Sequence, residues 1–256
     1  MKIVVCIKQV PDTSDIKWTE NNTMQREGVE SIINSFDLYA LEQALNIKKK
    51  LDNVEITAVT MGPSQAEDVL KYAISIGCDN GVLLTDKKFA GADTYATAKT
   101  LSAGIKLLGY DLILCGQYAI DGDTAQTGPG IASQLDIPQV TFVKNLDRYS
   151  QDSFYAVREL EDGDEVVKVE LPSLACILKG NYETTRPSIN GIKKAQTFKI
   201  TQYTMEDIGL TVEDVGIKGS PTFVSKAFKP EHNRGECTYC QTYASLAEKI
   251  KGYVNE

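Results

Sequence analysis

The sequence predicts an α/β fold in which a doubly wound parallel sheet carries an antiparallel extension and a C-terminal arm. Within roughly the first 135 residues, apolar strand patterns alternate four times with helical patterns, which is typical of a parallel sheet with helices on both faces. After Pro138 the pattern changes to short strands without helices between them, which indicates antiparallel pairing. At 256 residues the chain can bury a substantial core.

The first strand is expected at residues 2–7, whose nearly unbroken apolar run is typical of a central strand covered on both faces. Residues 17–29 are polar and are predicted to form a small hairpin. A helix follows, because leucines recur at near-helical spacing from residue 38. Asn34 precedes this helix, and its side chain could either cap the helix or face a ligand; Asp37 allows the same two interpretations.

The remaining strands and helices are predicted from the same patterns. Strands are expected at residues 54–61, 82–84 and 111–115, each followed by a helix, at 65–77, 94–108 and 131–135. The antiparallel extension is expected at 140–146, 153–159, 165–171 and 174–178, with a hairpin turn at 161–164 and a helix at 189–195.

The C-terminal region differs from the rest in composition. Residues 197–233 lack periodicity and are rich in proline, glycine and lysine, so we expect them to have no core of their own. A terminal helix is predicted at 245–254. We therefore divide the chain into an α/β domain at 1–195 and an arm with a terminal helix at 196–256. Because Phe223 and Phe228 lie in this arm, we expect it to dock on an obligate partner.

The loop at residues 116–130 is the strongest candidate for a binding site. It joins the strand at 111–115 to the next helix, and at such a junction the helix terminus offers unpaired N–H groups and partial positive charge to an anion. Gly116 and Gly122 are expected to allow close backbone approach or a positive φ. Groups that can cap the turn or hydrogen-bond a ligand are Asp121, Asp123, Thr124, Gln126 and Thr127. A phosphate is the ligand expected here, although an ordinary turn with an N-cap has similar residues.

Composition excludes several other functions. The net charge of −8 and pI near 4.9 disfavour nucleic acid and anionic membrane surfaces as partners. No apolar run approaches the ~18 to 20 residues of a membrane span, and a strand beginning at residue 2 leaves no room for a signal peptide, so we expect a cytoplasmic protein. Cys237 and Cys240 have the spacing of half a metal site, but the only histidine is His232, so no metal site is predicted.

Five segments, in order along the chain, resemble the β subunit of electron-transfer flavoproteins. They are residues 5–12, 33–37, 60–63, 90–94 and 116–130. The resemblance implies a fold of the adenine-nucleotide α-hydrolase type and pairing with a homologous α subunit that carries a second flavin. It also implies that an adenine nucleotide lies among Cys6, Asn34, Asp37, Met61, Thr94, Gly116, Asp121, Gly122, Asp123, Thr124, Ala125, Gln126 and Thr127.

Two branches of this family differ in the nucleotide that the β subunit holds. Residues 10–13, 26–29 and 121–126 resemble the branch that binds FAD, and the small Gly122 and Ala125 leave room for a diphosphate. That branch is associated with anaerobic electron bifurcation: FAD accepts hydride from NADH, and electrons pass to ferredoxin or flavodoxin and, through the α-subunit flavin, to a flavin dehydrogenase of acyl-CoA or hydroxy-acid type. The alternative is a β subunit with a structural AMP. An ATP-cleaving relative is disfavoured, because neither characteristic phosphate loop is present.

The family also has a loop that recognises partner dehydrogenases, which corresponds to residues 178–187. Its candidate recognition residues are Lys179, Gly180, Asn181, Tyr182 and Arg186. The family's Asn-x-Pro-Arg-Tyr-Pro pattern is replaced here by a different sequence at 180–188, so the resemblance leaves the identity of the dehydrogenase open.

Overall fold

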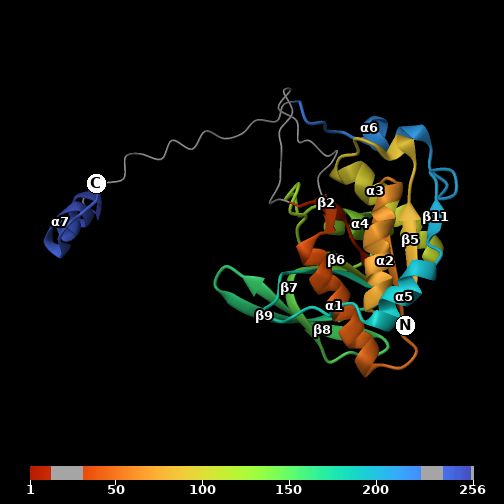
Figure 1. Cartoon of the computed structure of the whole chain (residues 1–256), viewed down its shortest axis with the longest axis horizontal. Coiled ribbons are helices and arrows are strands. Elements are labelled where there is room, and N and C mark those ends of the chain that lie inside the picture. Colours follow the sequence, from red (N-terminus) through yellow and green to blue (C-terminus); the bar gives the residue numbers. More distant parts are fainter. Residues whose placement is uncertain (13–30, 226–238, 255–256) are drawn as a thin grey trace.

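The computed structural model describes residues 1–12, 31–225 and 239–254. Within them, nine strands form one sheet in the order β11-β5-β4-β1-β6-β10-β7-β8-β9 (Figure 1). In that order the strands are Thr201–Tyr203, Asn80–Leu84, Glu55–Met61, Lys2–Cys6, Leu112–Gly116, Ser173–Ile177, Gln139–Asp147, Ser153–Leu160 and Gly163–Glu170. A separate antiparallel pair joins β2 (Gln9–Pro11) to β3 (Ser31–Ile33). The predicted α/β class with a parallel sheet is confirmed.

Helices cover both faces of the sheet because successive strand residues point to opposite sides. On one face, Val5 belongs to the core cluster that also contains residues of α1 (Ser35–Lys50), α2 (Glu67–Ile76) and α5 (Ile189–Thr197). On the other face, Val4 belongs to the cluster that contains residues of α3 (Thr94–Leu108) and α4 (Thr127–Leu135). Figure 1 shows these two helical layers around the sheet. Both faces of β1 are therefore buried, which explains its nearly unbroken apolar sequence.

The strand order reverses at β1, and this reversal positions the candidate site. β1 pairs in parallel with β4 on one side and with β6 on the other. The chain leaves β1 toward α1 on one face, whereas it leaves β6 toward α4 on the opposite face. A crevice between diverging connections at the carboxyl ends of the strands is the usual ligand position in this class of fold.

One strand of the predicted antiparallel extension lies elsewhere. The pairs β7–β8 and β8–β9 are antiparallel, as predicted, but β10 lies between β6 and β7 and is parallel to both. The prediction for this strand is therefore wrong. All five residues of β10 are buried, and four of them are apolar. Such a strand is typical of the interior of a parallel sheet, not of an extension with one face exposed to solvent.

The expectation that residues 197–233 lack a core is wrong for the first part of that segment. β11 extends the sheet by pairing in parallel with β5, and Met205, Ile208 and Val215 are buried in the core cluster of α3. These contacts are with residues distant in sequence, so no local periodicity reveals them. The division of the chain at residue 195 stays a prediction.

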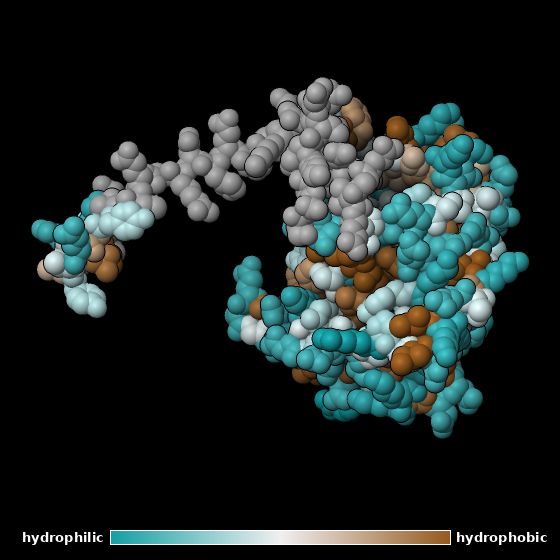
Figure 2. Space-filling model, viewed as in Figure 1, coloured by the Kyte–Doolittle hydropathy of each residue, from teal (hydrophilic) through white to brown (hydrophobic). Residues whose placement is uncertain are grey.

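The other predicted elements are present with small shifts. The helices expected at 189–195 and 245–254 are α5 and α7 (Tyr243–Val254), and a 3-10 turn at Ser64–Ala66 precedes α2. The hairpin expected at 17–29 lies outside the described residues. No helix in the described part of the chain is long and apolar enough to cross a membrane. On the face shown in Figure 2, hydrophilic residues predominate and hydrophobic areas lie between them.

Candidate nucleotide-binding edge of the sheet

Three connections meet at the carboxyl edge of the sheet. The loop at 117–126 leaves β6, whose Cys115 is the register partner of Cys6 at the end of β1. Thr94, the first residue of α3, donates from Oγ1 to Oε1 of Gln126 at 3.1 Å. The loop predicted from sequence therefore lies beside the ends of β1 and the start of α3, where the resemblance also placed binding residues.

The loop backbone has two residues with positive φ, and the second of them precedes a right-handed residue. Asp123 and Ala125 have φ of 48° and 54°, while Gln126 is right-handed at φ −103° and ψ −19°. A positive-φ residue next to a right-handed one, as at Ala125 and Gln126, turns successive N–H groups toward one side and forms an anion-binding concavity. The positive φ expected at Gly122 is wrong, because in this loop the positive φ values belong to Asp123 and Ala125. Asp adopts this conformation more readily than most residues, whereas Ala does so at a cost in strain.

The amide groups of this loop are available to a ligand. Among the described residues, no acceptor faces the backbone N–H groups of residues 124–128. α4 begins at Thr127, four residues before the helix predicted at 131–135, and its N-cap residue Gln126 makes no side-chain capping bond. A helix terminus without a cap and a run of unpaired amides make this loop a strong candidate for binding phosphate.

The side chain of Asn34 forms hydrogen bonds with the backbone of the loop at 117–126. Its Nδ2 donates to the Tyr118 carbonyl at 2.8 Å, and its Oδ1 accepts from the Ile120 amide at 3.2 Å. Nδ2 also donates to Oδ1 of Asp37 at 2.9 Å. Asn34 occupies the N-cap position of α1 but makes no side-chain capping bond, so the capping interpretation is wrong. A role of Asn34 in ligand binding stays a prediction, and in this arrangement its contribution is to shape the loop.

Asp37 joins the ends of β1 and β6. Its Oδ2 accepts from the Lys8 amide at 2.7 Å, and the Gly116 amide also hydrogen-bonds to the carboxyl group. Burial raises the pKa of Asp37 to about 7, although the hydrogen bonds from Asn34, Lys8 and Gly116 act to lower it. The close approach expected at Gly116 is confirmed, because a Cβ there would lie 2.8 Å from Cβ of Phe36 and closer still to Asp37.

Lys8 contributes the positive charge at this edge, and the sequence reasoning missed it. Its Nζ lies 2.7 Å from both carboxylate oxygens of Asp121. The available signal was a lysine placed just after an apolar strand at the carboxyl edge. Asp121 was expected to cap the turn or to hydrogen-bond a ligand, and the structure pairs it with Lys8.

The cysteines near the site are buried and free of disulfides. Cys6, Cys115 and Cys176 occupy one row across β1, β6 and β10. A hydrogen bond with Cys6, and then burial, raise the pKa of Cys115 well above its usual range, and burial raises the pKa of Cys176 to about 12. Within the described residues, no group of side chains has the arrangement of a metal site. Cys237 and His232 lie outside them, and Cys240 is a free thiol.

The predicted recognition loop is attached to α1. The ring of Tyr182 packs edge-on against Tyr39, and its hydroxyl accepts from Nε2 of Gln43 at 2.8 Å. The Thr185 amide donates to Oε2 of the buried Glu42 at 2.7 Å. Lys179, Asn181 and Arg186 are exposed, while Gly180 lies beneath the Tyr182 ring. The same helix thus supports this loop and, through Asn34 and Asp37, the candidate binding loop. A role in partner choice stays a prediction.

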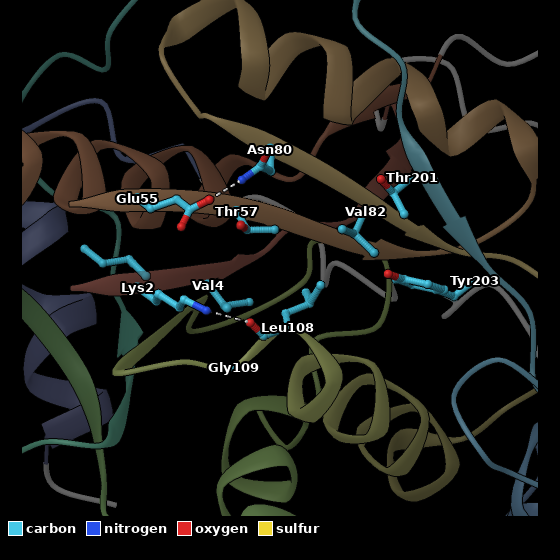
Figure 3. Close-up of a pocket in the computed structure, with 11 residues that line it drawn as sticks. Lys2, Val4, Glu55, Thr57, Asn80, Val82, Leu108, Gly109, Thr201 and Tyr203 are labelled. Carbon is cyan, nitrogen blue, oxygen red and sulfur yellow. Dashed lines mark hydrogen bonds between the residues drawn. The ribbon is translucent and has the colours of Figure 1, made fainter. Parts of the chain in front are cut away.

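A cavity of about 180 Å³ lies at the opposite, amino edge of the sheet (Figure 3). Lys2, Glu55, Thr57, Asn80 and Tyr203 are among the residues that line it. Its charged and amide groups largely bind one another: Asn80 Nδ2 donates to Oε1 of Glu55 at 2.7 Å, and Lys2 Nζ donates to the Leu108 carbonyl at 3.4 Å. We assign the candidate site to the carboxyl edge, because unpaired donors are found there together with a charged side chain.

Comparisons with known proteins identify the family of this chain. A family model described as an electron transfer flavoprotein domain matches residues 21–207. The electron transfer flavoprotein subunit beta of Thermoanaerobacterium thermosaccharolyticum is 46% identical over 236 residues, covering 91% of this chain and 90% of that protein. The Caffeyl-CoA reductase-Etf complex subunit CarD of Acetobacterium woodii is 43% identical over 98% of both chains. Protein FixA of Sinorhizobium fredii is 42% identical over 98% of this chain and 90% of that protein.

Proposed function

This chain belongs to the electron transfer flavoprotein family, and on that premise we propose that it is a β subunit that holds FAD against the loop at 117–128. The observation that carries the proposal is the run of unpaired backbone N–H groups at residues 124–128, where the strand order reverses. A diphosphate requires several donors in one place, and a positive-φ residue next to a right-handed one, as at Ala125 and Gln126, is the backbone arrangement that turns successive amides toward one anion.

The residues of the loop have distinct roles in this proposal. The amides of residues 124–128 bind phosphate oxygens, and the side chains of Thr124, Gln126 and Thr127 add hydrogen bonds. Asn34 and Asp37 hold the loop in shape from the core side. FAD, when bound, supplies the redox chemistry: it accepts hydride from NADH and passes electrons on singly.

We further propose that the chain works with an α subunit that carries a second flavin. Ferredoxin or flavodoxin is the low-potential acceptor, and a flavin dehydrogenase of acyl-CoA or hydroxy-acid type receives the other electron. This anaerobic, cytoplasmic role is supported by the resemblance of 10–13 and 121–126 to the FAD-binding branch, and by the similarity to a subunit of a caffeyl-CoA reductase complex.

Exposed apolar side chains at the C-terminus support docking on the α subunit. Phe223 and Val224 are more than four-fifths exposed, at 82% and 84%, and Tyr243 of α7 is 93% exposed. Leu246 and Ile250 of α7 are also exposed and, with Tyr243, recur at helical spacing. A chain ending at residue 238 should therefore fail to co-purify with a co-expressed α subunit. Co-purification at full yield would contradict this assignment of the arm.

The nucleotide content of the native αβ complex tests the proposal. Acid extraction followed by chromatography should give two FAD and no AMP per αβ unit. One FAD and one AMP would overturn the proposal in favour of a structural nucleotide. The visible spectrum during stepwise reduction with NADH provides an independent measurement, because two flavins in different surroundings should be reduced in separate phases.

Two variants test whether the flavin binds at the loop at 117–128. A Cβ at Gly122 would meet no atom within 4 Å, so Gly122→Trp should keep the fold but obstruct the ligand, while Gly122→Ala serves as the matched control. Thr127→Val should weaken FAD binding about ten- to a hundredfold, the effect of losing a hydrogen bond to a charged group, and Thr127→Ser should retain binding. Unchanged FAD content in Gly122→Trp and Thr127→Val would place the flavin elsewhere.

A further inference from the structure

The backbone of Lys8 is fixed on both sides at the end of β1. Its N–H donates to Oδ2 of Asp37 at 2.7 Å, and its carbonyl accepts from the Asn34 amide at 2.9 Å. The side chain extends from this fixed point to the loop at 117–126, where Nζ contacts Asp121. The origin of the side chain is therefore rigid, whereas the flexible four-carbon stem lets the ammonium change partners.

The charge of the loop shows why such a cation is needed. Residues 116–130 include Asp121 and Asp123 but no lysine or arginine. A phosphate bound at the amides of 124–128 would therefore share this loop with two carboxylates, and like charges repel one another. Lys8 is the cation whose ammonium contacts the loop in the described structure.

The ion pair is arranged so that the ammonium can be shared. Nζ of Lys8 is bound to one carboxylate, and the Lys8 side chain is 48% exposed, whereas the Asp121 side chain is only 12% exposed. Solvent, or an anion that replaces it, therefore has access to the ammonium while Asp121 remains packed in the loop. An ammonium has three donors, so it can bind a phosphate oxygen with or without releasing Asp121.

We propose that Lys8 binds a phosphate group of the nucleotide and that Asp121 is the counter-ion that holds the ammonium at the loop until the phosphate replaces it. This inference rests on the proposed function, because it assumes a nucleotide at the loop. It assigns the two partners opposite effects: Lys8 favours the anion, and Asp121 competes with it. A purely structural ion pair would instead make both residues favour binding, since loss of either would loosen the loop.

The test compares ADP with adenosine, which lacks the phosphates. Binding of each to the αβ complex freed of nucleotide is measured by calorimetry, and the ratio of the two affinities is the readout. Lys8→Met should lower the preference for ADP about tenfold, the effect of losing a charge-assisted hydrogen bond, and Lys8→Arg should largely restore it. Asp121→Asn should raise the preference severalfold. Because adenosine reports any general distortion of the site, a loosened loop would not mimic these results.

An unchanged ADP preference in Lys8→Met, or a fall in both Lys8→Met and Asp121→Asn, would overturn the role of Lys8. If the wild-type complex binds ADP in that case, the proposed nucleotide site stands and only this inference fails. Absence of ADP binding to the wild-type complex would overturn the proposed function and this inference together. Lys144→Met is a suitable control, because Lys144 also pairs with aspartate, at Asp164, but lies on β7.

Discussion

The two edges of the sheet differ in how completely their polar groups are hydrogen-bonded within the protein. At the amino edge there is a cavity, yet Asn80 binds Glu55, Lys2 binds Leu108, and the Lys2 amide binds Asp111 at 2.6 Å. At the carboxyl edge, five consecutive amides have no acceptor among the described residues. A hollow whose polar groups are already paired gains little from a ligand, whereas unpaired donors on a supported loop gain a hydrogen bond each.

The support beneath the carboxyl edge is also more deeply buried. Asn34 is 1% exposed and Asp37 is 5% exposed, and both bind backbone groups of neighbouring connections. Buried polar groups contribute most to stability when all their hydrogen-bonding partners are present, and stability falls most when one of these partners is removed. Substitutions should therefore have larger effects at the carboxyl edge than at the amino edge.

The largest expected effect is the pH dependence introduced by Asp37. Its pKa rises from an ordinary value of 3.8 to about 7 in the folded chain, so between these values the folded form binds more protons than the unfolded form. Ionisation of Asp37 therefore lowers the free energy of unfolding as pH rises from about 4 to 7. Across this pH range the wild type should lose up to roughly 4 kcal/mol of unfolding free energy, since a tenfold change in proton affinity is worth about 1.4 kcal/mol. Asp37→Asn has no carboxyl group to ionise, so this loss should be absent from the variant.

Urea denaturation of wild type and Asp37→Asn at several values between pH 4.5 and 7.5 measures this effect. The stability of the variant relative to wild type should increase with pH across that window. The asparagine cannot accept all the hydrogen bonds of the carboxylate, so the trend, not the absolute difference, is the readout. A difference that does not change with pH would contradict the titration of Asp37 in this range.

Gly116→Ala should have the next largest effect, because the new Cβ would lie 2.8 Å from Cβ of Phe36 and 2.9 Å from its carbonyl carbon. Overpacking against backbone should cost about 3 kcal/mol of unfolding free energy. Gly122→Ala is the control from the same loop and should change stability by less than about 0.5 kcal/mol. Equal stability of the two variants in thermal denaturation would show that β6 and α1 are not in close contact at this position.

Asn34→Ala should cost about 2 kcal/mol, because it leaves the Tyr118 carbonyl and the Ile120 amide without their partner. Hydrogen exchange should accelerate at residues 118–128 while the strands remain protected. The α1 variant Asn46→Ala should show neither change, since Asn46 accepts only a 3.3 Å bond from Lys49. Unchanged exchange in the loop of Asn34→Ala would remove the argument that Asn34 shapes the site.

The smallest effect is expected at the amino edge. Asn80→Ala removes one exposed bond to Glu55, so it should change the free energy of unfolding by no more than about 0.5 kcal/mol and leave ADP binding unaltered. Calorimetry of ADP with the αβ complex containing this variant measures the binding. A marked loss of ADP affinity would contradict the assignment of the site to the carboxyl edge and would show that the cavity at the amino edge affects ADP binding.

The sequence by itself determined the fold class, the loop between β6 and α4 that is the candidate site, and the terminal helix. These features depend on local patterns: unbroken apolar strands, helical spacing of leucines, and polar residues between a strand and a helix. The resemblance of five segments to electron-transfer flavoprotein β subunits was also contained in the sequence, and the match at 21–207 agrees with it.

Only the tertiary structure decided how the site is supported. Asn34 meets Tyr118 across 84 residues, and Lys8 meets Asp121 across 113, and no local pattern encodes contacts at such separations. The parallel placement of β10 and the edge strand β11 likewise depend on pairing with strands far away in the chain. The left-handed conformations fell on Asp123 and Ala125 instead of Gly122, because the path imposed by β6 and α4 outweighs the intrinsic preference of single residues.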